Sequence, residues 1–203
     1  MERRTKHDLR SAATRERLVS AARHLFGERG YAGVATEEIV HAAGVTRGAL
    51  YHQFRDKADL FAAVAETVEA EVTARIAAGA LATTADPVEA LRAGARLFLE
   101  VHADPEIGRI LLDAPAVLGW TAWRELGLRY GLGLVRAALQ AAMDAGAIAV
   151  QPVVPLAHML IGALDESALY VARADDPTAA RAECLAVFDQ LMRGLAPPGP
   201  VAG

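Results

Sequence analysis

The sequence predicts an all-α protein in which an N-terminal three-helix helix-turn-helix module joins a larger helical domain. Ala and Leu dominate the chain, and aromatic residues make up only 5% of it. Few segments show the alternation of apolar and polar residues that strands require. Apolar residues recur instead at helical spacing, between Ser, Thr, Asp, Gly and Pro residues that mark helix ends. About nine helices are therefore expected.

The second and third predicted helices are short, and the first three follow one another closely. Each begins at a threonine whose hydroxyl can cap exposed backbone N–H groups, and the first two end at a glycine. The third carries Leu50 and Phe54 on its apolar face. In chain order, the expected caps and terminal glycines are Thr14, Gly30, Thr36, Gly44 and Thr46.

Six further helices are expected in the rest of the chain. Asp56 can cap a long fourth helix, and Asp-Pro pairs mark the starts of the fifth, sixth and ninth, since proline suits the first helical position. Pro115 should interrupt the stretch that follows the sixth start. The expected starts and ranges are Asp86-Pro87, Asp104-Pro105, Trp123 to Gly146, Leu156 to Arg173 after a 152–155 linker, and Pro177 to Leu195.

The resulting organisation has four parts. Residues 1–13 are expected to form a flexible basic arm, 14–60 the helix-turn-helix domain, 61–196 the larger helical domain, and 197–203 a disordered tail rich in proline. No linker is long enough to separate two independent bodies, so the fourth helix should belong to both.

Charge is distributed unevenly between these parts. The formal net charge is −4, but through Lys57 there are eleven Lys or Arg against seven Asp or Glu, which gives +4, whereas the remainder has ten against eighteen, which gives −8. Since DNA attracts positive charge, any DNA contact belongs to the N-terminal part.

Other functional classes find little support. Cys184 is the only cysteine, so no internal disulfide can form, and the charged start MERRTKHDLR lacks an apolar leader segment. A soluble cytoplasmic protein is expected. No HExxH, CxxC, GxSxG or P-loop pattern occurs. We expect no enzyme activity, no cofactor and no metal site.

Residues 36–57, TEEIVHAAGVTRGALYHQFRDK, place two short helices on either side of Gly44-Val45. This spacing is typical of a helix-turn-helix, and the segment resembles the TetR family of transcription regulators. The resemblance covers about the first quarter of the chain. It implies a repressor that binds a palindromic DNA operator as a homodimer and is released by a small molecule.

Arg47 is the strongest candidate for base readout, because a guanidinium can bond O6 and N7 of guanine together; a solvated or phosphate-bound arginine is the alternative. Gly48 permits close approach to DNA. The resemblance implies phosphate contacts for Tyr51, Lys57 and Thr36. Gln53 departs from the His or Tyr common in the family. The predicted DNA-binding residues are Thr36, Val45, Thr46, Arg47, Gly48, Tyr51, His52 and Lys57.

The resemblance also implies a ligand pocket beside the fourth helix and a dimer interface built from the last two helices. Candidate pocket residues are Val68, Phe98, Val101, His102, Leu111, Trp120, Trp123 and Tyr130. Candidate interface residues are Leu160, Leu164, Ser167, Val171, Leu185, Phe188, Leu191 and Met192. Ordinary packing within one chain is the alternative for both sets.

Two other functions remain open on sequence grounds. The first is a small-molecule-binding protein whose N-terminal module no longer selects a DNA sequence. The second is a helical enzyme that uses Asp165 or Glu166, which adjoin each other within an apolar helix with His158 two turns earlier. Loss of turnover on substitution of either carboxylate would identify an enzyme.

Overall fold

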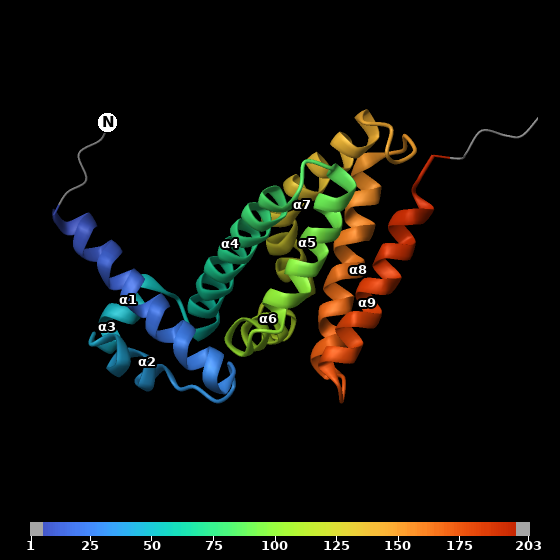
Figure 1. Cartoon of the computed structure of the whole chain (residues 1–203). Helices are drawn as coiled ribbons and strands as arrows, with labels where there is room; N and C mark the ends of the chain where they lie inside the picture. Colours follow the sequence, from blue (N-terminus) through green and yellow to red (C-terminus); the bar gives the residue numbers. More distant parts are fainter. Residues whose placement is uncertain (1–5, 198–203) are drawn as a thin grey trace, which may run out of the picture. The chain divides into compact units, whose positions relative to one another are not determined.

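The computed structural model describes residues 6–197, and all regular secondary structure within that range is α-helix. This confirms the predicted fold class. Figure 1 shows the nine helices of the described residues in chain order. They are α1 (Lys6–Arg29), α2 (Thr36–Ala43), α3 (Arg47–Gln53), α4 (Lys57–Thr83), α5 (Pro87–His102), α6 (Pro105–Leu118), α7 (Trp120–Asp144), α8 (Val153–Arg173) and α9 (Pro177–Gly194).

The chain forms two compact units, and each contains parts that are distant in sequence. The first unit comprises the residues up to Val68 together with 105–124, and the second comprises 69–104 and the residues from Glu125 onward. Helix α6 thus joins the helix-turn-helix module, which the predicted division at residue 60 did not anticipate. Polar contacts fix it there: Glu106 pairs with Arg23 of α1, and Asp113 accepts the backbone N–H of Tyr31 at 2.7 Å.

The predicted helix starts were right where an aspartate or Thr46 supplies the cap. Asp86 Oδ1 accepts the N–H groups of Val88 and Glu89, and Asp176 Oδ1 does the same at the start of α9. Asp56 Oδ1 accepts the N–H of Asp59 at 2.8 Å at the start of α4. A side-chain acceptor at this position satisfies donors that the first helical turn leaves unpaired.

Two threonines expected as caps do not cap. Helix α1 already includes residues 6–13, so most of the predicted arm is helical, and the Thr14 hydroxyl donates to the Arg10 carbonyl inside the helix. Residues 1–5 of that arm and 198–203 of the predicted tail lie outside the described residues. Ala35 is the N-cap of α2, where the Glu38 carboxylate accepts the Ala35 N–H. Thr36 is instead the first helical residue.

Three later boundaries also differ from the prediction. Helix α6 continues through Pro115 to Leu118, and Gly119, with φ +79°, separates it from α7, which begins at Trp120. Buried Ile110, Leu111 and Ala114 hold α6 in place around the proline. Helix α8 begins at Val153, because Pro155 falls in its first turn, where a missing N–H breaks no helical hydrogen bond.

Each unit has an apolar core of its own. In the first unit the rings of Phe26, Tyr31 and Phe61 lie 5.3 to 5.7 Å apart between centroids, and both phenylalanines are fully buried. In the second, helices α5, α8 and α9 pack together, with α8 and α9 side by side (Figure 1). Its core consists of Leu91, Ala95, Leu139, Ala142, Met143, Ile148, Leu156, Ala157, Leu160, Phe188 and Met192.

Candidate DNA-binding surface and ligand pocket

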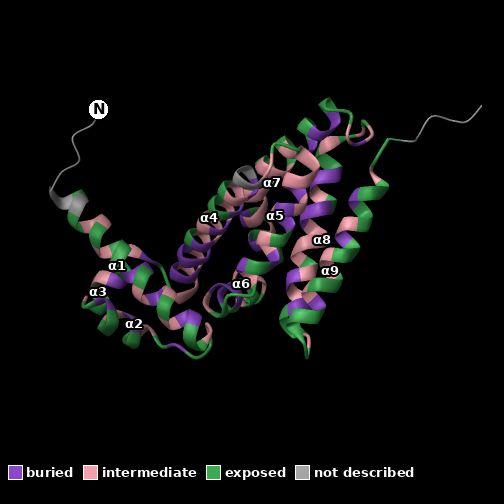
Figure 2. Cartoon of the chain, in the orientation of Figure 1, coloured by how far each residue is buried: buried purple, intermediate pink, exposed green. Residues whose placement is uncertain are grey.

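Helix α3 has one buried face and one exposed face. Leu50 within it and Phe54 directly after it are buried and anchor it in the first unit. The Thr46 hydroxyl caps its start by accepting the Ala49 N–H at 3.2 Å, as predicted. The exposed face carries Arg47, Gly48, Tyr51 and His52, and Figure 2 shows how much of α2 and α3 is exposed. A capped, anchored helix thus presents polar side chains to solvent.

Arg47 is positioned by neighbours from both short helices. Its guanidinium lies 3.1 Å from the Glu37 carboxylate and 5.5 Å from the centre of the Tyr51 ring. The Glu37 backbone N–H and the Thr36 hydroxyl lower the pKa of that carboxyl, with a smaller contribution from Arg47, so Glu37 is ionised at neutral pH. This ion pair therefore orients Arg47, whose guanidinium carries several N–H donors that can face a ligand.

The turn between α2 and α3 depends on Gly44. Its φ of +60° is a conformation that side-chain-bearing residues rarely adopt. The Arg17 guanidinium donates to the Gly44 carbonyl at 2.9 Å, and a Cβ at residue 44 would lie 2.7 Å from Nη2 of Arg17. The half-buried Val45 follows, with its N–H bonded to the Val40 carbonyl. The angle between the two helices is thus held by α1.

Lys57 points into the first unit. Its ammonium donates to the carbonyls of Tyr31 and Val34, at 2.8 and 2.9 Å, and lies 4.0 Å from the centre of the Tyr31 ring. Gln53, whose role the sequence left open, donates to the Ser11 hydroxyl of α1 at 2.8 Å. Of the predicted DNA-binding residues, Lys57 thus fixes the loop before α2, whereas those of α3 form the exposed surface.

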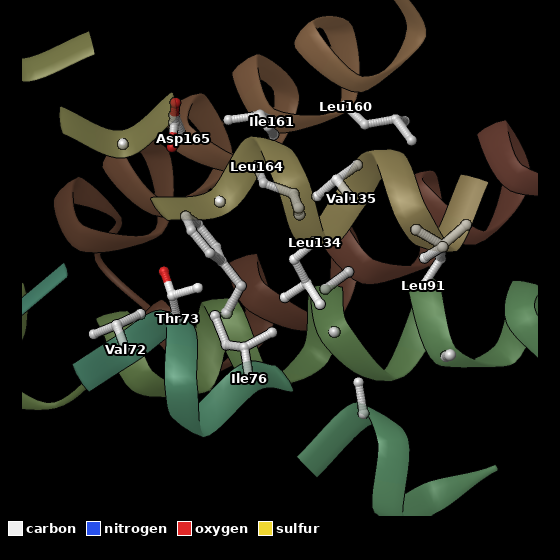
Figure 3. Close-up of a pocket in the computed structure, with 18 of the residues that line it drawn as sticks. Val72, Thr73, Ile76, Leu91, Leu134, Val135, Leu160, Ile161, Leu164 and Asp165 are labelled. Atoms are coloured by element: carbon white, nitrogen blue, oxygen red, sulfur yellow. The ribbon is translucent and has the colours of Figure 1, made fainter. Parts of the chain in front are cut away.

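The second unit encloses a pocket of about 130 Å³ (Figure 3). One buried water needs roughly 10–15 Å³ on the same measure, so the pocket can hold an organic molecule. Helices α4, α5, α7, α8 and α9 line it. The lining residues are Glu69, Val72, Thr73, Ile76, Ala80, Ala90, Leu91, Gly94, Ala95, Phe98, Gly127, Gly131, Leu134, Val135, Ala138, Leu160, Ile161, Leu164, Asp165 and Phe188.

The polar residues of this pocket lie toward one of its ends. In Figure 3, Asp165 and Thr73 lie on the side opposite Leu91. Glu69 comes one helical turn before Thr73, and the two face the same cavity. Burial, with a smaller contribution from the charge of Asp165, raises the pKa of Glu69 to about 7. The pocket is therefore an apolar space with acidic groups in its wall.

Phe98 alone, among the pocket residues predicted from sequence, lines this cavity. Val68, Val101, Leu111 and Trp123 are buried in the packing, whereas Trp120 is 66% exposed and Tyr130 is half-buried.

The His102 ring stacks on Phe98, with 3.9 Å between centroids, and Nδ1 donates to the Phe98 carbonyl at 2.7 Å. Burial lowers the pKa of His102 to about 4, so it is neutral.

Most of the residues predicted for a dimer interface face inward within a single chain. Leu160, Val171, Phe188 and Met192 are buried, Leu164 and Leu185 pack partly buried against the core, and the Ser167 hydroxyl donates to the Ala163 carbonyl. Leu191 is 51% exposed. The exposed large apolar side chains of α8 and α9 are Val154, Met159, Tyr170, Val187 and Leu191.

Sequence reasoning missed most of the pocket for identifiable reasons. Gly127 and Gly131 line the pocket with backbone alone, and no sequence motif marks a glycine for this role. The sequence drew attention to Asp165 as an acid within an apolar helix, but only as a carboxylate for catalysis. Glu69 had a similar signal that was overlooked, since it shares a helical face with Val72 and Ile76.

Neither a metal centre nor a membrane segment is visible in the part of the chain described here. No three His, Cys, Asp or Glu side chains among the described residues are grouped as metal ligands. Within the same residues, every helix is too short or too polar to cross a membrane.

Comparison with known proteins identifies the family. The profile described as "Bacterial regulatory proteins, tetR family" matches residues 18–64, and that of "Tetracyclin repressor-like, C-terminal domain" matches 88–195, more than half of the chain. The protein belongs to the TetR family and is a DNA-binding transcription regulator, as the sequence predicted. The family is one of regulators and not of enzymes.

Individual relatives agree with this assignment. The chain is 34% identical over 113 residues to the regulator AcrR of Shigella flexneri, a match covering 56% of this chain and 52%, or about half, of that protein. A TetR-family regulator from Pectobacterium atrosepticum is 35% identical, with a TM-score of 0.83 over 96% of this chain and 99% of that one. RolR, solved with resorcinol, is 22% identical with a TM-score of 0.73 over 96% and 99%, and shows a shared fold.

Proposed function

We propose that this regulator is a repressor that binds a palindromic operator as a homodimer and leaves it when a small molecule occupies the pocket of the second unit. The observation that carries the DNA-binding part is the exposed face of α3, where Arg47, Gly48 and Tyr51 lie beyond the anchoring Leu50 and Phe54. A helix with this arrangement can enter the major groove with its first residues toward the bases.

A second copy of the chain is the proposed partner of α8 and α9. Met159 and Tyr170 lie eleven residues apart, about three helical turns, and Val187 and Leu191 lie one turn apart, so each pair shares a helical face. These side chains are 71%, 54%, 61% and 51% exposed. Apolar surface on two adjacent helices fits a two-fold interface, and a dimer brings two recognition helices to one operator.

Dimerisation is tested by sedimentation velocity of the wild type and of Met159→Glu, Leu191→Glu and Val150→Glu. Val150 is 86% exposed and lies outside α8 and α9, so it serves as a matched control. We expect the first two variants to shift the population to monomer and the third to remain dimeric. Dimers in all three variants would contradict the proposed interface.

The operator proposal is tested by selecting duplexes from a random library and measuring affinity at several salt concentrations. Because phosphate contacts release counterions, nonspecific binding falls steeply with salt, and only sequence-specific binding enriches one family of duplexes. An enriched palindrome supports the proposal. Equal binding to all duplexes would support the alternative of a ligand-binding protein without sequence choice.

Ligand control rests on the pocket itself. The size and apolar lining of the cavity suit a small organic molecule, and RolR, which shares the fold, was solved with such a molecule. A thermal-shift screen of metabolites identifies binders, and each is then added to the protein–operator complex. We expect at least one binder to weaken operator affinity; binders without any such effect would contradict the release mechanism.

A further inference from the structure

The chemistry of the pocket wall narrows the class of ligand. Its titratable groups are Glu69 of α4 and Asp165 of α8, and none of the described residues that line it is Lys, Arg or His. The stretches of α5, α7 and α9 in the wall contribute only apolar residues and glycines. An anionic ligand would bring a further negative charge beside these two carboxyl groups, and no cationic side chain among the described residues that line the pocket would receive it.

Glu69 also lacks a partner of opposite charge. No hydrogen bond or ion pair joins its carboxylate to another of the described residues, and its one strong electrostatic neighbour is a second carboxylate, Asp165. Transfer of a carboxylate out of water is costly unless a cation or a donor compensates it. A ligand that brings a positive charge would supply that compensation to Glu69, whereas a neutral hydroxyl would leave its negative charge without a counter-charge.

The rest of the pocket suits an apolar body. Val72, Ile76, Leu134 and Val135 form its walls, as Figure 3 shows. A Cβ added at Gly127 or Gly131 would meet no heavy atom within 4 Å, so the space in front of α7 is open. A molecule that fills this space buries its own apolar surface, which favours binding.

We propose that the pocket binds an organic amine, whose apolar part fills the cavity and whose protonated nitrogen lies against the Glu69 carboxylate at the side that Asp165 shares. This inference depends on the proposed function for its regulatory consequence, because the amine would then be the signal that releases DNA. The pocket chemistry also selects against carboxylic acids and phosphate esters of similar size.

Calorimetry with matched compounds tests the charge preference. The probes are the amine, alcohol and carboxylate of three skeletons: decyl, 4-phenylbutyl and 2-(2-naphthyl)ethyl. In the wild type we expect at least one amine to bind about tenfold more tightly than both its alcohol and its carboxylate. If the alcohol equals the amine, if the carboxylate binds best, or if none of the nine compounds binds, the inference is overturned.

Two variants assign the preference to the pocket. Glu69→Gln keeps the shape but removes the charge, so the ratio of amine to alcohol affinity should fall about fivefold or more. Gly131→Leu should abolish binding by filling the cavity, whereas Gly133→Leu, on the same helix but exposed and outside the pocket, should leave it unchanged. If Gly131→Leu and Gly133→Leu changed amine affinity equally, or if Glu69→Gln left the ratio of amine to alcohol affinity unchanged, the amine would bind outside this pocket.

Proton release gives a readout that shape alone would not produce. At pH 7 Glu69, with a pKa of about 7, is half protonated, and a bound cation lowers that pKa, so about half a proton should leave per amine bound. Calorimetry in buffers of different ionisation enthalpy measures it. Proton release should vanish in Glu69→Gln; release that persists there would come from another group and contradict the assignment.

Operator selection on the same proteins separates the two proposals. None of the substituted residues lies in the first unit, so the variants should select the same duplexes as the wild type. A chain that selects an operator but shows no amine preference overturns the ligand class and leaves the regulator standing. A chain that prefers amines but selects no operator overturns the proposed operator binding and leaves the ligand class standing.

Discussion

Charged side chains are used differently in the two units of the molecule. In the first, Arg17 and Lys57 donate to backbone carbonyls, and Arg47 is oriented by Glu37. In the second, Glu69 faces an apolar cavity without a cationic partner among the described residues, beside a second carboxylate. Paired charges fix the surface proposed to bind DNA, whereas an acidic group without a cationic partner, Glu69, is suited to an exchangeable ligand.

The core of the first unit and the pocket wall of the second also differ in packing. Substitutions that test this difference should have the largest effect on stability. Phe61 is fully buried between the rings of Phe26 and Tyr31, so Phe61→Ala should cost about 3–5 kcal/mol of unfolding free energy. Phe98 borders the pocket and is only half-buried, so Phe98→Ala should cost clearly less. Urea denaturation measures both, and equal losses would mean that the pocket wall is as well packed as the first core.

The pH dependence of stability should contain two opposing contributions from the second unit. Glu69 has its pKa raised from 4.5 to about 7, so the folded chain holds more protons there and stability falls as pH rises through that range. His102 has its pKa lowered from 6.5 to about 4, so the unfolded chain holds more protons and stability rises between those values. Between about pH 4.5 and 6.5 the two contributions should largely cancel.

Single substitutions should expose each contribution. Glu69→Gln should leave stability rising with pH from about 4 to 6.5, by roughly 3 kcal/mol, and His102→Phe should leave it falling from about 4.5 to 7. Denaturation midpoints across pH 4 to 8 provide the measurement. Parallel profiles in the wild type and both variants would contradict the burial of these groups.

A substitution of Lys57 tests whether its charge stabilises the fold of the first unit. Lys57→Ala removes two charge-assisted hydrogen bonds to the loop before α2 and should lower stability by about 2 kcal/mol. Phosphate contacts do not depend on base sequence. If Lys57 supports such contacts through its charge or by holding the loop before α2, Lys57→Ala should lower affinity for operator and random duplex together. A loss confined to the operator would instead assign base readout to Lys57.

Arg47 should behave in the opposite way. Its exposed guanidinium contributes little to packing, so Arg47→Ala should leave unfolding free energy within about 0.5 kcal/mol while lowering operator affinity about tenfold or more. Affinity for random duplex should change much less. Tyr51→Phe retains the ring beside Arg47 but removes the hydroxyl predicted to contact phosphate, so it should weaken binding to both kinds of DNA alike. Equal loss on both kinds of DNA in Arg47→Ala would make Arg47 a phosphate contact.

The smallest expected effect concerns the glycines of α7. Gly133 is exposed and a Cβ there would meet nothing within 4 Å, so Gly133→Ala should raise stability by about 0.5–1 kcal/mol through helix propensity. Gly131→Ala should give a similar gain but reduce the room for a ligand. Thermal unfolding with and without a pocket binder distinguishes the two variants; identical responses to the binder would argue against the pocket.

The sequence alone determined the features that depend on neighbouring residues. Asp56, Asp86 and Asp176 cap the helices they precede, and Gly44 turns the chain between α2 and α3, because these hydrogen bonds and dihedral angles involve residues a few positions apart. The segment around Arg47 was recognisable for the same reason. Helical spacing also predicted that Leu50 and Phe54 are buried.

Tertiary structure decided everything that depends on residues far apart in the chain. Helix α6 joined the first unit through Arg23 and Tyr31, some eighty residues earlier. Lys57 turned inward because Tyr31 and Val34 offered carbonyl acceptors. Glu69 and Asp165, nearly a hundred positions apart, met in one cavity wall. A helical period shows which face of a helix is apolar, but the neighbour that covers that face is set by three-dimensional packing.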